Sequence, residues 1–303
     1  MAETKKANGG ASANILRGKY KKRSQFKSVW FRFRKNRLAM FGMMILSIMI
    51  LVAVFADFFA DYNTDAIQQN LIQRLQSPNA EHIFGTDALG RDMFARIIFG
   101  ARISLFVGLI TVAISLTFGL IIGASAGYFG GWVDSVLMRL MDVFLAIPQT
   151  LMAITIVAAL GGGLVNLLIA LSISSIPRFS RVVRSSILSI KGQEFVEAAR
   201  ACGTSNRRII LKHIIPNAIG PIIVQATLNM ATTVLTIASL SFIGLGVKAP
   251  MPEWGTMLAE AKDQMRYHPY LIVIPGVAIV LSVMGLNLIG DGLRDALDPR
   301  LKN

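Results

Sequence analysis

Long apolar runs alternate with short polar stretches along the chain, and the lengths of the runs predict helices that cross a membrane. Residues 38–56 contain no ionisable side chain over 19 positions, close to the roughly 20 residues that a helix needs to cross a bilayer. The uncharged runs at 103–133, 214–247 and 271–290 are at least as long. We expect one span from each run, with the second ending near Tyr128.

Two further spans are predicted between the second and the fifth. The third is expected from Ser135 to about Leu160, with a kink at Pro148. Arg139 and Asp142 lie three positions apart, so they can pair at its cytoplasmic end. These spans bring the expected total to six transmembrane helices.

The fourth span has two interpretations. Three glycines at 161–163 predict a tight turn, and only 13 apolar residues follow before Pro177, roughly 20 Å of helix at about 1.5 Å per residue. Either the glycine turn lies inside a protein-lined cavity, or the helix continues past Pro177 with its arginines reaching the inner membrane surface. We favour the continuous helix, whose arginines are Arg178, Arg181 and Arg184.

Small residues predict close packing of the second span. They recur every four positions on one face, at Ser115, Gly119, Gly123 and Gly127. Such a stripe lets the backbone of another helix approach closely.

The composition and the charges agree with an all-α polytopic membrane protein. The chain is 53% hydrophobic and only 16% charged, too apolar for a soluble domain of its size. The net charge of +14 could indicate nucleic acid, but the basic residues crowd the ends of apolar runs, which favours a lipid bilayer as partner. With six spans, 24 Lys and Arg lie on the side of both termini and 7 on the other. The positive-inside rule therefore predicts an N-in/C-in orientation.

The predicted organisation has five parts. They are a basic cytoplasmic arm (1–37), a first transmembrane helix (38–59), an extracytoplasmic loop (60–102), a five-helix core (103–291) with a cytoplasmic loop (190–216), and a cytoplasmic tail (292–303). The arm is too long and too basic for a secretory leader, so we expect it to remain attached. Its residues to about Ala13 are expected to be disordered. Trp30, Phe31 and Phe33 suggest a segment on the membrane surface.

The polar passage at 193–216 predicts two short helices. Gly203 occupies the place of a left-handed C-terminal residue, Thr204 or Ser205 can cap the second helix, and Pro216 is expected to end it. The first helix carries a patch without bulk, Ala198 and Ala199, beside the charges of Glu194, Glu197 and Arg200. Another protein could approach such a patch closely. The alternative is a solvated amphipathic loop.

Polar residues in the fifth span suggest a translocation path. Polar groups inside hydrocarbon usually face other helices or water. They either make hydrogen bonds between helices or line the path, and the candidates for the path are Gln225, Asn229, Thr232 and Thr236.

Several kinds of chemistry have no sequence signal. The Gly18-Lys19 pair lacks the rest of a P-loop, so the chain is not expected to hydrolyse ATP. His82, His213 and His268 are too scattered for a zinc motif, and Cys202 is the only cysteine. We therefore expect no catalytic set and no metal site. The predicted spans hold no acid near their centres, which argues against a proton- or sodium-coupled carrier.

The polar passage resembles a known motif. Glu197-Ala-Ala, followed after three residues by Gly203 and later by Pro216, is similar to the "EAA" loop of the permease subunits of ATP-binding-cassette (ABC) importers. That loop inserts into a groove of the ATPase. His213 and Ile215 occupy places where the family pattern usually has Ile and Leu.

Three other stretches narrow the resemblance to one subfamily. They are residues 82–105, residues 239–246 with 252–255, and residues 290–300. They resemble the C-type permease of dipeptide, oligopeptide and nickel importers, and the likeness extends from Phe31 to the end of the chain.

The resemblance implies a type I ABC importer permease fold in a prokaryotic cytoplasmic membrane. Its implied partners are a second, homologous permease, two cytoplasmic ATPases that hold ATP and Mg²⁺, and an extracytoplasmic substrate-binding protein. ATPase closure would then drive alternating access. The alternatives are a stand-alone carrier or channel subunit, a membrane anchor, and an importer of nickel or another small solute.

The outer loops contain candidates for contact with the binding protein. They are Asp87, Arg91, Asp92 and Trp254. The alternative for the charges is a surface ladder on a helix that also includes Arg96. The alternative for Trp254 is an aromatic anchor at the membrane interface.

Overall fold

The computed structural model describes residues 25–297, and every regular element in that part of the chain is a helix. The principal helices are α2 (Gln25–Lys35), α3 (Arg37–Val54), α5 (Met93–Phe129), α6 (Gly131–Leu145), α7 (Gln149–Leu160), α8 (Leu164–Lys191), α9 (Glu194–Ala201), α11 (Ile215–Phe242), α12 (Trp254–Ala261) and α13 (Tyr270–Leu297). The short elements are α4 (Ala56–Phe59), α10 (Asn206–Arg208), the π-helical η1 (Tyr62–Ile67) and η3 (Ile209–Ile214), and the 3-10 turns η2 (Leu71–Gln73) and η4 (Lys262–Gln264). The expected disorder up to about Ala13 lies outside the described residues.

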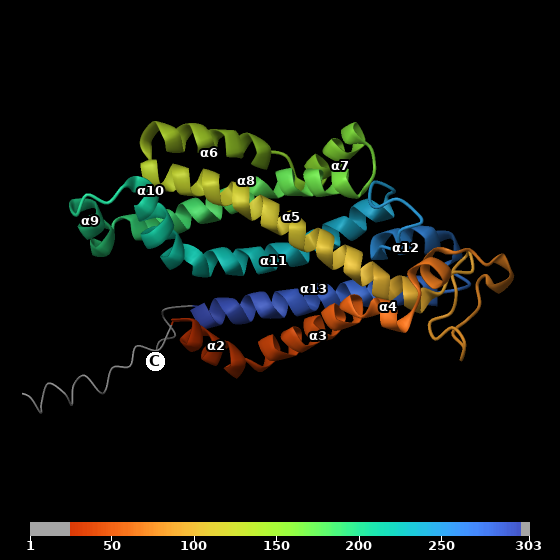
Figure 1. Ribbon diagram of the computed structural model, residues 1–303. Coiled ribbons are helices and arrows are strands. Elements are labelled where there is room, and N and C mark those ends of the chain that lie inside the picture. Colours follow the sequence, from red (N-terminus) through yellow and green to blue (C-terminus); the bar gives the residue numbers. More distant parts are fainter. Residues whose placement is uncertain (1–24, 298–303) are drawn as a thin grey trace, which may run out of the picture.

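The long helices form an elongated bundle (Figure 1). α5, α8 and α11 pack together in its middle, α3 and α13 pack on one side, and α6 and α7 cover α8 on the other. α9 and α10 lie at one end, here called the α9 end. α12 and residues 60–92 lie at the opposite end, here called the α12 end.

Four segments are long and apolar enough to cross a membrane: α3, α5, the continuous segment Asn206–Phe242 and α13. The number is five if α6 and α7, bent by 82° at their junction, count as one broken span. The all-α polytopic prediction is thus confirmed in its coarse form. The sixth span and the N-in/C-in orientation stay predictions.

The third predicted span is broken rather than kinked. Pro148 stands immediately before α7 with an extended ψ of 133°. A proline in a helix interior removes a backbone hydrogen bond and clashes with the preceding turn, and it disfavours a helical conformation of the residue before it. The chain therefore starts a new helix at Gln149.

The predicted ion pair between Arg139 and Asp142 is wrong. Asp142 instead pairs with Arg181 of α8 at 2.5 Å, and Asp134 pairs with Arg184 at 2.5 Å. Because α8 packs beneath α6, its arginines reach across to the acids of α6. α8 itself continues unbroken through Pro177 to Lys191, which confirms that the helix does not end at Pro177. That its arginines reach the inner membrane surface stays a prediction.

α5 begins at Met93, earlier than the predicted start at residue 103. Asp92 caps it, since its Oδ1 accepts a hydrogen bond from the Ala95 N–H at 2.8 Å. The last ten residues of the predicted outer loop, 93–102, are therefore helical. The expected end near Tyr128 is confirmed, because α5 ends at Phe129. α13 likewise continues to Leu297, past the predicted core boundary at 291.

The stripe of small residues on α5 is a packing seam against α8, as predicted. A Cβ at Gly119 would overlap Phe179, and one at Gly123 would overlap the Ser180 carbonyl. The Ser115 hydroxyl donates across the seam to the Ser172 carbonyl at 3.0 Å. Close packing of α5 on α8 therefore depends on the absence of side chains here.

Candidate functional site

The polar passage forms a separate helical element at the α9 end. α9 ends where Gly203 adopts a left-handed conformation with φ of 73°. The Gly203 N–H donates to the Arg200 carbonyl at 3.0 Å, and the Thr204 N–H donates to the Ala199 carbonyl at 3.1 Å, which closes the turn. The predicted short first helix and the turn at Gly203 are confirmed.

The predicted helix stop at Pro216 is wrong. The chain passes from α10 through η3 into α11 as one continuous segment, and Pro216 occupies the first turn of α11. A proline is tolerated there because its missing N–H is not needed in a first turn. Ser205 does stand at the capping position of α10, but its side chain makes no capping hydrogen bond.

Buried contacts fix this element to the bundle. Val196 of α9 is fully buried in an apolar cluster with Ile187 of α8 and with Ile209 and Ile214 of η3. The Tyr128 hydroxyl at the end of α5 donates to Asn206 Oδ1 at 2.7 Å. α9 is thus joined by direct contacts to α5, to α8 and to η3, which leads into α11.

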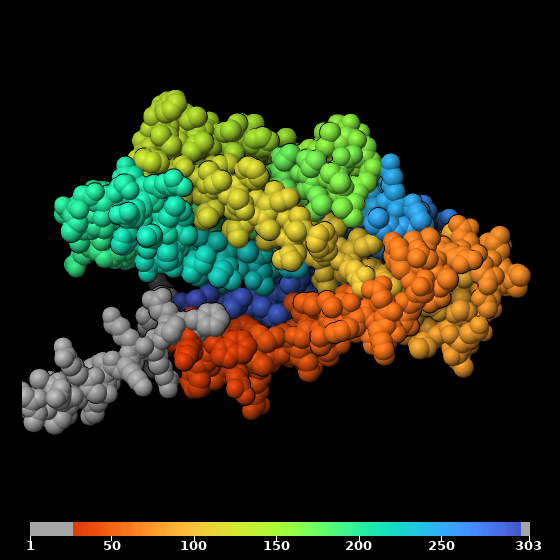
Figure 2. All heavy atoms as spheres, viewed as in Figure 1, coloured from red at the N-terminus to blue at the C-terminus, as the bar shows by residue number. Residues whose placement is uncertain are grey.

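The outer surface of α9 carries acidic side chains that form no ion pair with the described residues. Glu194, Glu197, Ala198 and Arg200 are exposed, and Ala199 is half-buried. Within residues 25–297 neither glutamate has an ion-pair partner. The Arg200 guanidinium lies 5.9 Å from the Tyr128 ring centroid. In Figure 2 this region forms a projecting lobe at one end of the molecule.

The four predicted path residues of α11 fall into two groups. Asn229 and Thr236 are buried within the chain, whereas Thr232 is exposed and Gln225 is half-buried. The Thr236 hydroxyl donates to the Thr232 carbonyl at 2.8 Å, so its donor is already used. Of the four, the structure brings only Gln225 and Thr232 to the outer face of the helix.

α13 contributes a polar group beside that face that sequence reasoning missed. Asn287 is exposed, and with Leu235 of α11 it lines a groove of about 470 Å³. The sequence does distinguish Asn287, because it is the only amide side chain in the apolar run 271–290.

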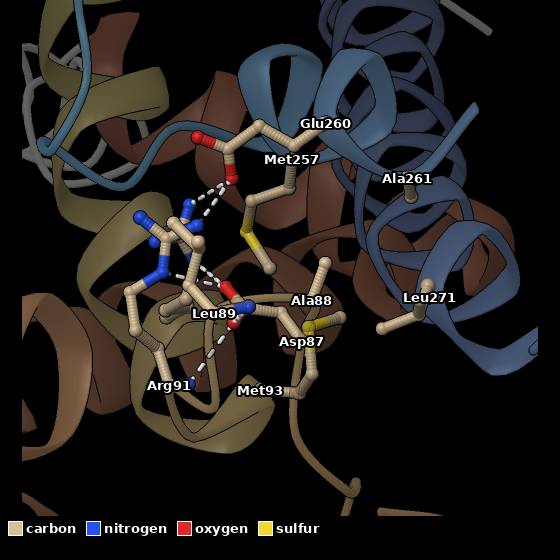
Figure 3. Close-up of a pocket in the computed structure, with 10 residues that line it drawn as sticks. Asp87, Ala88, Leu89, Arg91, Met93, Met257, Glu260, Ala261 and Leu271 are labelled. Carbon is tan, nitrogen blue, oxygen red and sulfur yellow. Dashed lines mark hydrogen bonds and ion pairs between the residues drawn. The ribbon is translucent and has the colours of Figure 1, made fainter. Parts of the chain in front are cut away.

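A cluster of charged side chains lines a cavity of about 240 Å³ at the α12 end (Figure 3). Arg91 Nε donates to Asp87 Oδ2 at 2.6 Å, and Arg91 Nη2 donates to Glu260 Oε2 at 2.6 Å. Arg96 Nη2 donates to the same Glu260 oxygen at 2.8 Å. Both arginines are almost completely buried, with exposed fractions of 2% and 1%. We call Asp87, Arg91, Arg96 and Glu260 the charge cluster.

The surface ladder considered for these charges is wrong. Asp87 and Arg91 lie in the turn before α5, and Asp92 is the cap of α5. His82 Nδ1 lies 2.7 Å from Asp92 Oδ2. The charges therefore bind one another inside the fold instead of facing solvent along one helix.

Trp254 is a buried packing residue, so the interpretation as an interfacial anchor is also wrong. Its ring is 1% exposed, and its Nε1 donates to the Ile97 carbonyl at 3.1 Å. Its neighbour Glu253 caps α12 by accepting from the N–H groups of Gly255 and Thr256, both at 2.9 Å. α12 is thereby held against α5.

Glu260 is the member of the charge cluster that the sequence did not reveal. It lies between the apolar runs 214–247 and 271–290, and nothing in the neighbouring sequence distinguishes it from a solvated acid. Its pairing with Arg91 joins residues 169 positions apart. Among the described residues no group of three or more His, Cys, Asp or Glu side chains could hold a metal ion.

Comparison with known families gives two matches along the chain. Residues 119–303 match the family described as "Binding-protein-dependent transport system inner membrane component". Residues 24–78 match the "N-terminal TM domain of oligopeptide transport permease C".

Several named proteins are similar over almost the whole chain. The dipeptide transport system permease protein DppC of Alkalihalophilus pseudofirmus is 48% identical over 280 residues, 92% of this chain and 91% of that protein. The oligopeptide transport system permease protein OppC of Bacillus subtilis is 41% identical, covering 100% of this chain and 97% of that protein. The glutathione transport system permease protein GsiD of Escherichia coli is 44% identical over 92% of both chains.

Solved structures share the fold at lower identity. A chain of the MetNI methionine ABC transporter in an inward-facing conformation aligns with a TM-score of 0.57 and 20% identity, covering 68% of this chain and 98% of that chain. A chain of an amino acid ABC transporter aligns with a TM-score of 0.53 and 17% identity, covering 67% and 95%.

Proposed function

Because the chain belongs to the family of inner membrane components of binding-protein-dependent transport systems, we propose that it is one permease subunit of an importer of dipeptides or oligopeptides. The chain is a multi-pass protein of the cytoplasmic membrane. The names of its relatives support the cargo, since they carry dipeptides, oligopeptides and glutathione. All three cargoes are small peptides.

The proposed complex has five subunits. This chain pairs with a homologous permease, two cytoplasmic ATPases bind ATP and Mg²⁺, and an extracytoplasmic binding protein delivers the peptide. The orientation that places α9 in the cytoplasm is supported by the excess of basic residues on that side, 24 against 7.

The observation that carries the proposal is the construction of the α9 end. An exposed surface with unpaired charges stands on a buried apolar base joined to three core helices. ATPase closure would move this surface, and the core helices would rock between outward-facing and inward-facing arrangements. Coupling requires the ATPase to bind these arrangements with different affinity. The proposed coupling residues are Glu194, Glu197, Ala198, Ala199, Arg200, Gly203 and Pro216.

The exposure of the polar side chains of α11 decides which of them are proposed to line the path. Gln225 and Thr232 face outward from α11, so they are proposed to meet the peptide or its water. Asn229 and Thr236 support that face from inside the helix bundle. Asn287 joins the proposed path because it is exposed beside α11.

The binding protein is proposed to dock on the α12 end. Asp87, Arg91, Asp92 and Trp254 contribute there by holding the loop before α5 and the start of α12 in place, because Arg91 and Trp254 are buried. Exposed residues around them would form the contact itself.

Co-purification tests the proposal against its main alternative. The chain is expressed with the neighbouring permease, ATPase and binding-protein genes, purified through a tag on this chain, and placed in lipid nanodiscs. We expect both ATPases to co-purify, and we expect peptide-loaded binding protein to stimulate ATP hydrolysis. Peptide uptake by the chain alone, without ATPases, would instead identify a stand-alone carrier.

A further inference from the structure

Arg96 in the charge cluster has hydrogen-bond donors that no described residue accepts. Its Nη1 and Nε atoms are buried and have no hydrogen-bond partner within the described residues, although Nε lies 3.6 Å from Asp87 Oδ2. The side chain is 1% exposed and lines the cavity of about 240 Å³. Buried guanidinium groups normally use their N–H donors. The unused donors therefore leave room for an acceptor beyond the described residues, either water or a ligand.

The cavity is polar at one side and apolar at the other. The arginines and their carboxylates form the polar side, and Met93, Met257 and Leu271 belong to the apolar lining. Figure 3 shows the Glu260 carboxylate directed from α12 toward Arg91, with Met257 beside it. Such a cavity suits a group that carries an acceptor oxygen next to a small apolar side chain.

Glu260 occupies this site as an internal carboxylate. The Nη2 atoms of Arg91 and Arg96 converge on its Oε2 at 2.6 and 2.8 Å. A carboxylate between two guanidinium groups is among the strongest charge-assisted arrangements. The chain thus already contains a carboxylate-binding site, with one of its own side chains in it.

The two acids of the charge cluster differ in how firmly they are held. Asp87 accepts hydrogen bonds from the N–H groups of Leu89 and Arg91 and from Arg91 Nε, at 2.8, 3.0 and 2.6 Å. Within the described residues Glu260 is bound only through Oε2, and its side chain is 30% exposed against 10% for Asp87. Glu260 can therefore turn toward solvent, whereas Asp87 is fixed by its own turn.

We propose that this cavity binds the C-terminal carboxylate of a peptide, which takes the place of Glu260 on Arg91 and Arg96. The exchange replaces one carboxylate by another, so the buried charges stay balanced. The peptide carboxylate also supplies an acceptor for the unused donors of Arg96, and its last side chain meets the apolar wall. The assignment to a peptide rests on the proposed function.

Chemical rescue tests the site. Glu260→Ala removes the internal carboxylate and leaves room for acetate, and its thermal unfolding is followed in the purified complex in nanodiscs. We expect acetate to raise the unfolding midpoint of this variant by about 2–4 °C, and to raise that of the wild type less, because Glu260 competes. The double variant Glu260→Ala/Arg96→Gln, which keeps the remaining charges balanced, should not respond. Asp263→Ala, an exposed acid nearby, should respond as the wild type does.

The dipeptide alanyl-leucine and its C-terminal amide identify the ligand. We expect the free dipeptide to stabilise Glu260→Ala and the amide to have no effect. If acetate stabilises the variant but neither peptide does, the site is a carboxylate site without a role for peptide, and the assignment is overturned. If neither acetate nor dipeptide stabilises it, the charge cluster is a structural ion-pair network with water in the cavity.

The same preparations separate this proposal from the proposed function. Co-purification of the ATPases and stimulation by the loaded binding protein are measured for each variant. Intact stimulation without any acetate or dipeptide effect refutes the carboxylate site alone. Absence of the ATPases from the wild-type preparation refutes the importer itself.

Discussion

Charged side chains are arranged in opposite ways at the two ends of the bundle. At the α12 end, two arginines are buried and paired with two acids inside the fold. At the α9 end, Glu194 and Glu197 face solvent without ion-pair partners in the described chain, and an apolar residue, Val196, is buried beneath them. At one end the arginines and acids pair with one another, whereas the acids at the other end are available to pair with a second protein.

Because of this difference, substitutions at the two ends should affect different properties: stability at the α12 end and coupling to the ATPases at the α9 end. Removing one partner of a buried pair leaves an uncompensated charge, which is strongly destabilising. Removing an exposed, unpaired charge changes stability little. Substitutions at the α12 end should therefore weaken the fold, and substitutions at the α9 end should affect transport in a protein that remains folded.

The largest effect is expected for Asp87→Ala. The substitution leaves Arg91 buried without the acid that holds its Nε, and we expect the free energy of unfolding to fall by about 3–5 kcal/mol. Thermal and denaturant unfolding of the purified complex measure this loss, with Asp263→Ala as an exposed control. Wild-type stability in Asp87→Ala would show that the charge cluster does not hold the α12 end together.

Gly203→Val should combine a smaller loss of stability with a loss of transport. A β-branched residue at a φ of 73° costs about 1–2 kcal/mol or more in the left-handed region, so the turn between α9 and α10 should change. Peptide uptake and stimulated ATP hydrolysis should both fall. Gly203→Asn is the matched control, because asparagine tolerates this conformation and should keep both activities. Unchanged peptide uptake in Gly203→Val would show that coupling does not depend on this turn.

Glu197→Ala should leave the unfolding midpoint unchanged while lowering ATPase stimulation. The side chain is exposed and has no ion-pair partner in the described chain, so its removal costs the fold little stability. Glu194→Ala is compared in the same assay to show which acid makes the contact. If both variants retain wild-type stimulation and ATPase binding, the exposed acids of α9 do not dock the ATPase.

The sequence predicted the features that depend on local chemistry. Uncharged runs revealed the apolar helices, the glycine stripe revealed the seam between α5 and α8, and Gly203 revealed the turn after α9. Each of these depends on residues a few positions apart. The helix stop predicted at Pro216 was wrong because a proline is compatible with either the end or the first turn of a helix.

The features that depend on distant partners could not be predicted. Glu260 reaches Arg91 across 169 positions, and no local pattern identifies that pair. The burial of Asn229 and the exposure of Thr232 depend on how α11 is rotated against α5 and α13, which its own polar residues do not determine. The extension of α5 to Met93 follows from the cap at Asp92 and from packing against α12, although residues 93–102 carry two arginines.

Labelling of Cys202 tests the contrast between the two ends with the smallest expected effect on the protein. It is the only cysteine in the chain, it is exposed, and it lies at the end of α9 beside the proposed contact. A membrane-impermeant maleimide should label it only from the cytoplasmic side, and bound ATPases should slow the reaction without any change in stability. Labelling from the outer side would reverse the predicted orientation. If the labelling rate is unchanged with ATPases bound, the ATPase contact does not cover Cys202. The acids at the start of α9 would then have to form that contact without the end of the helix.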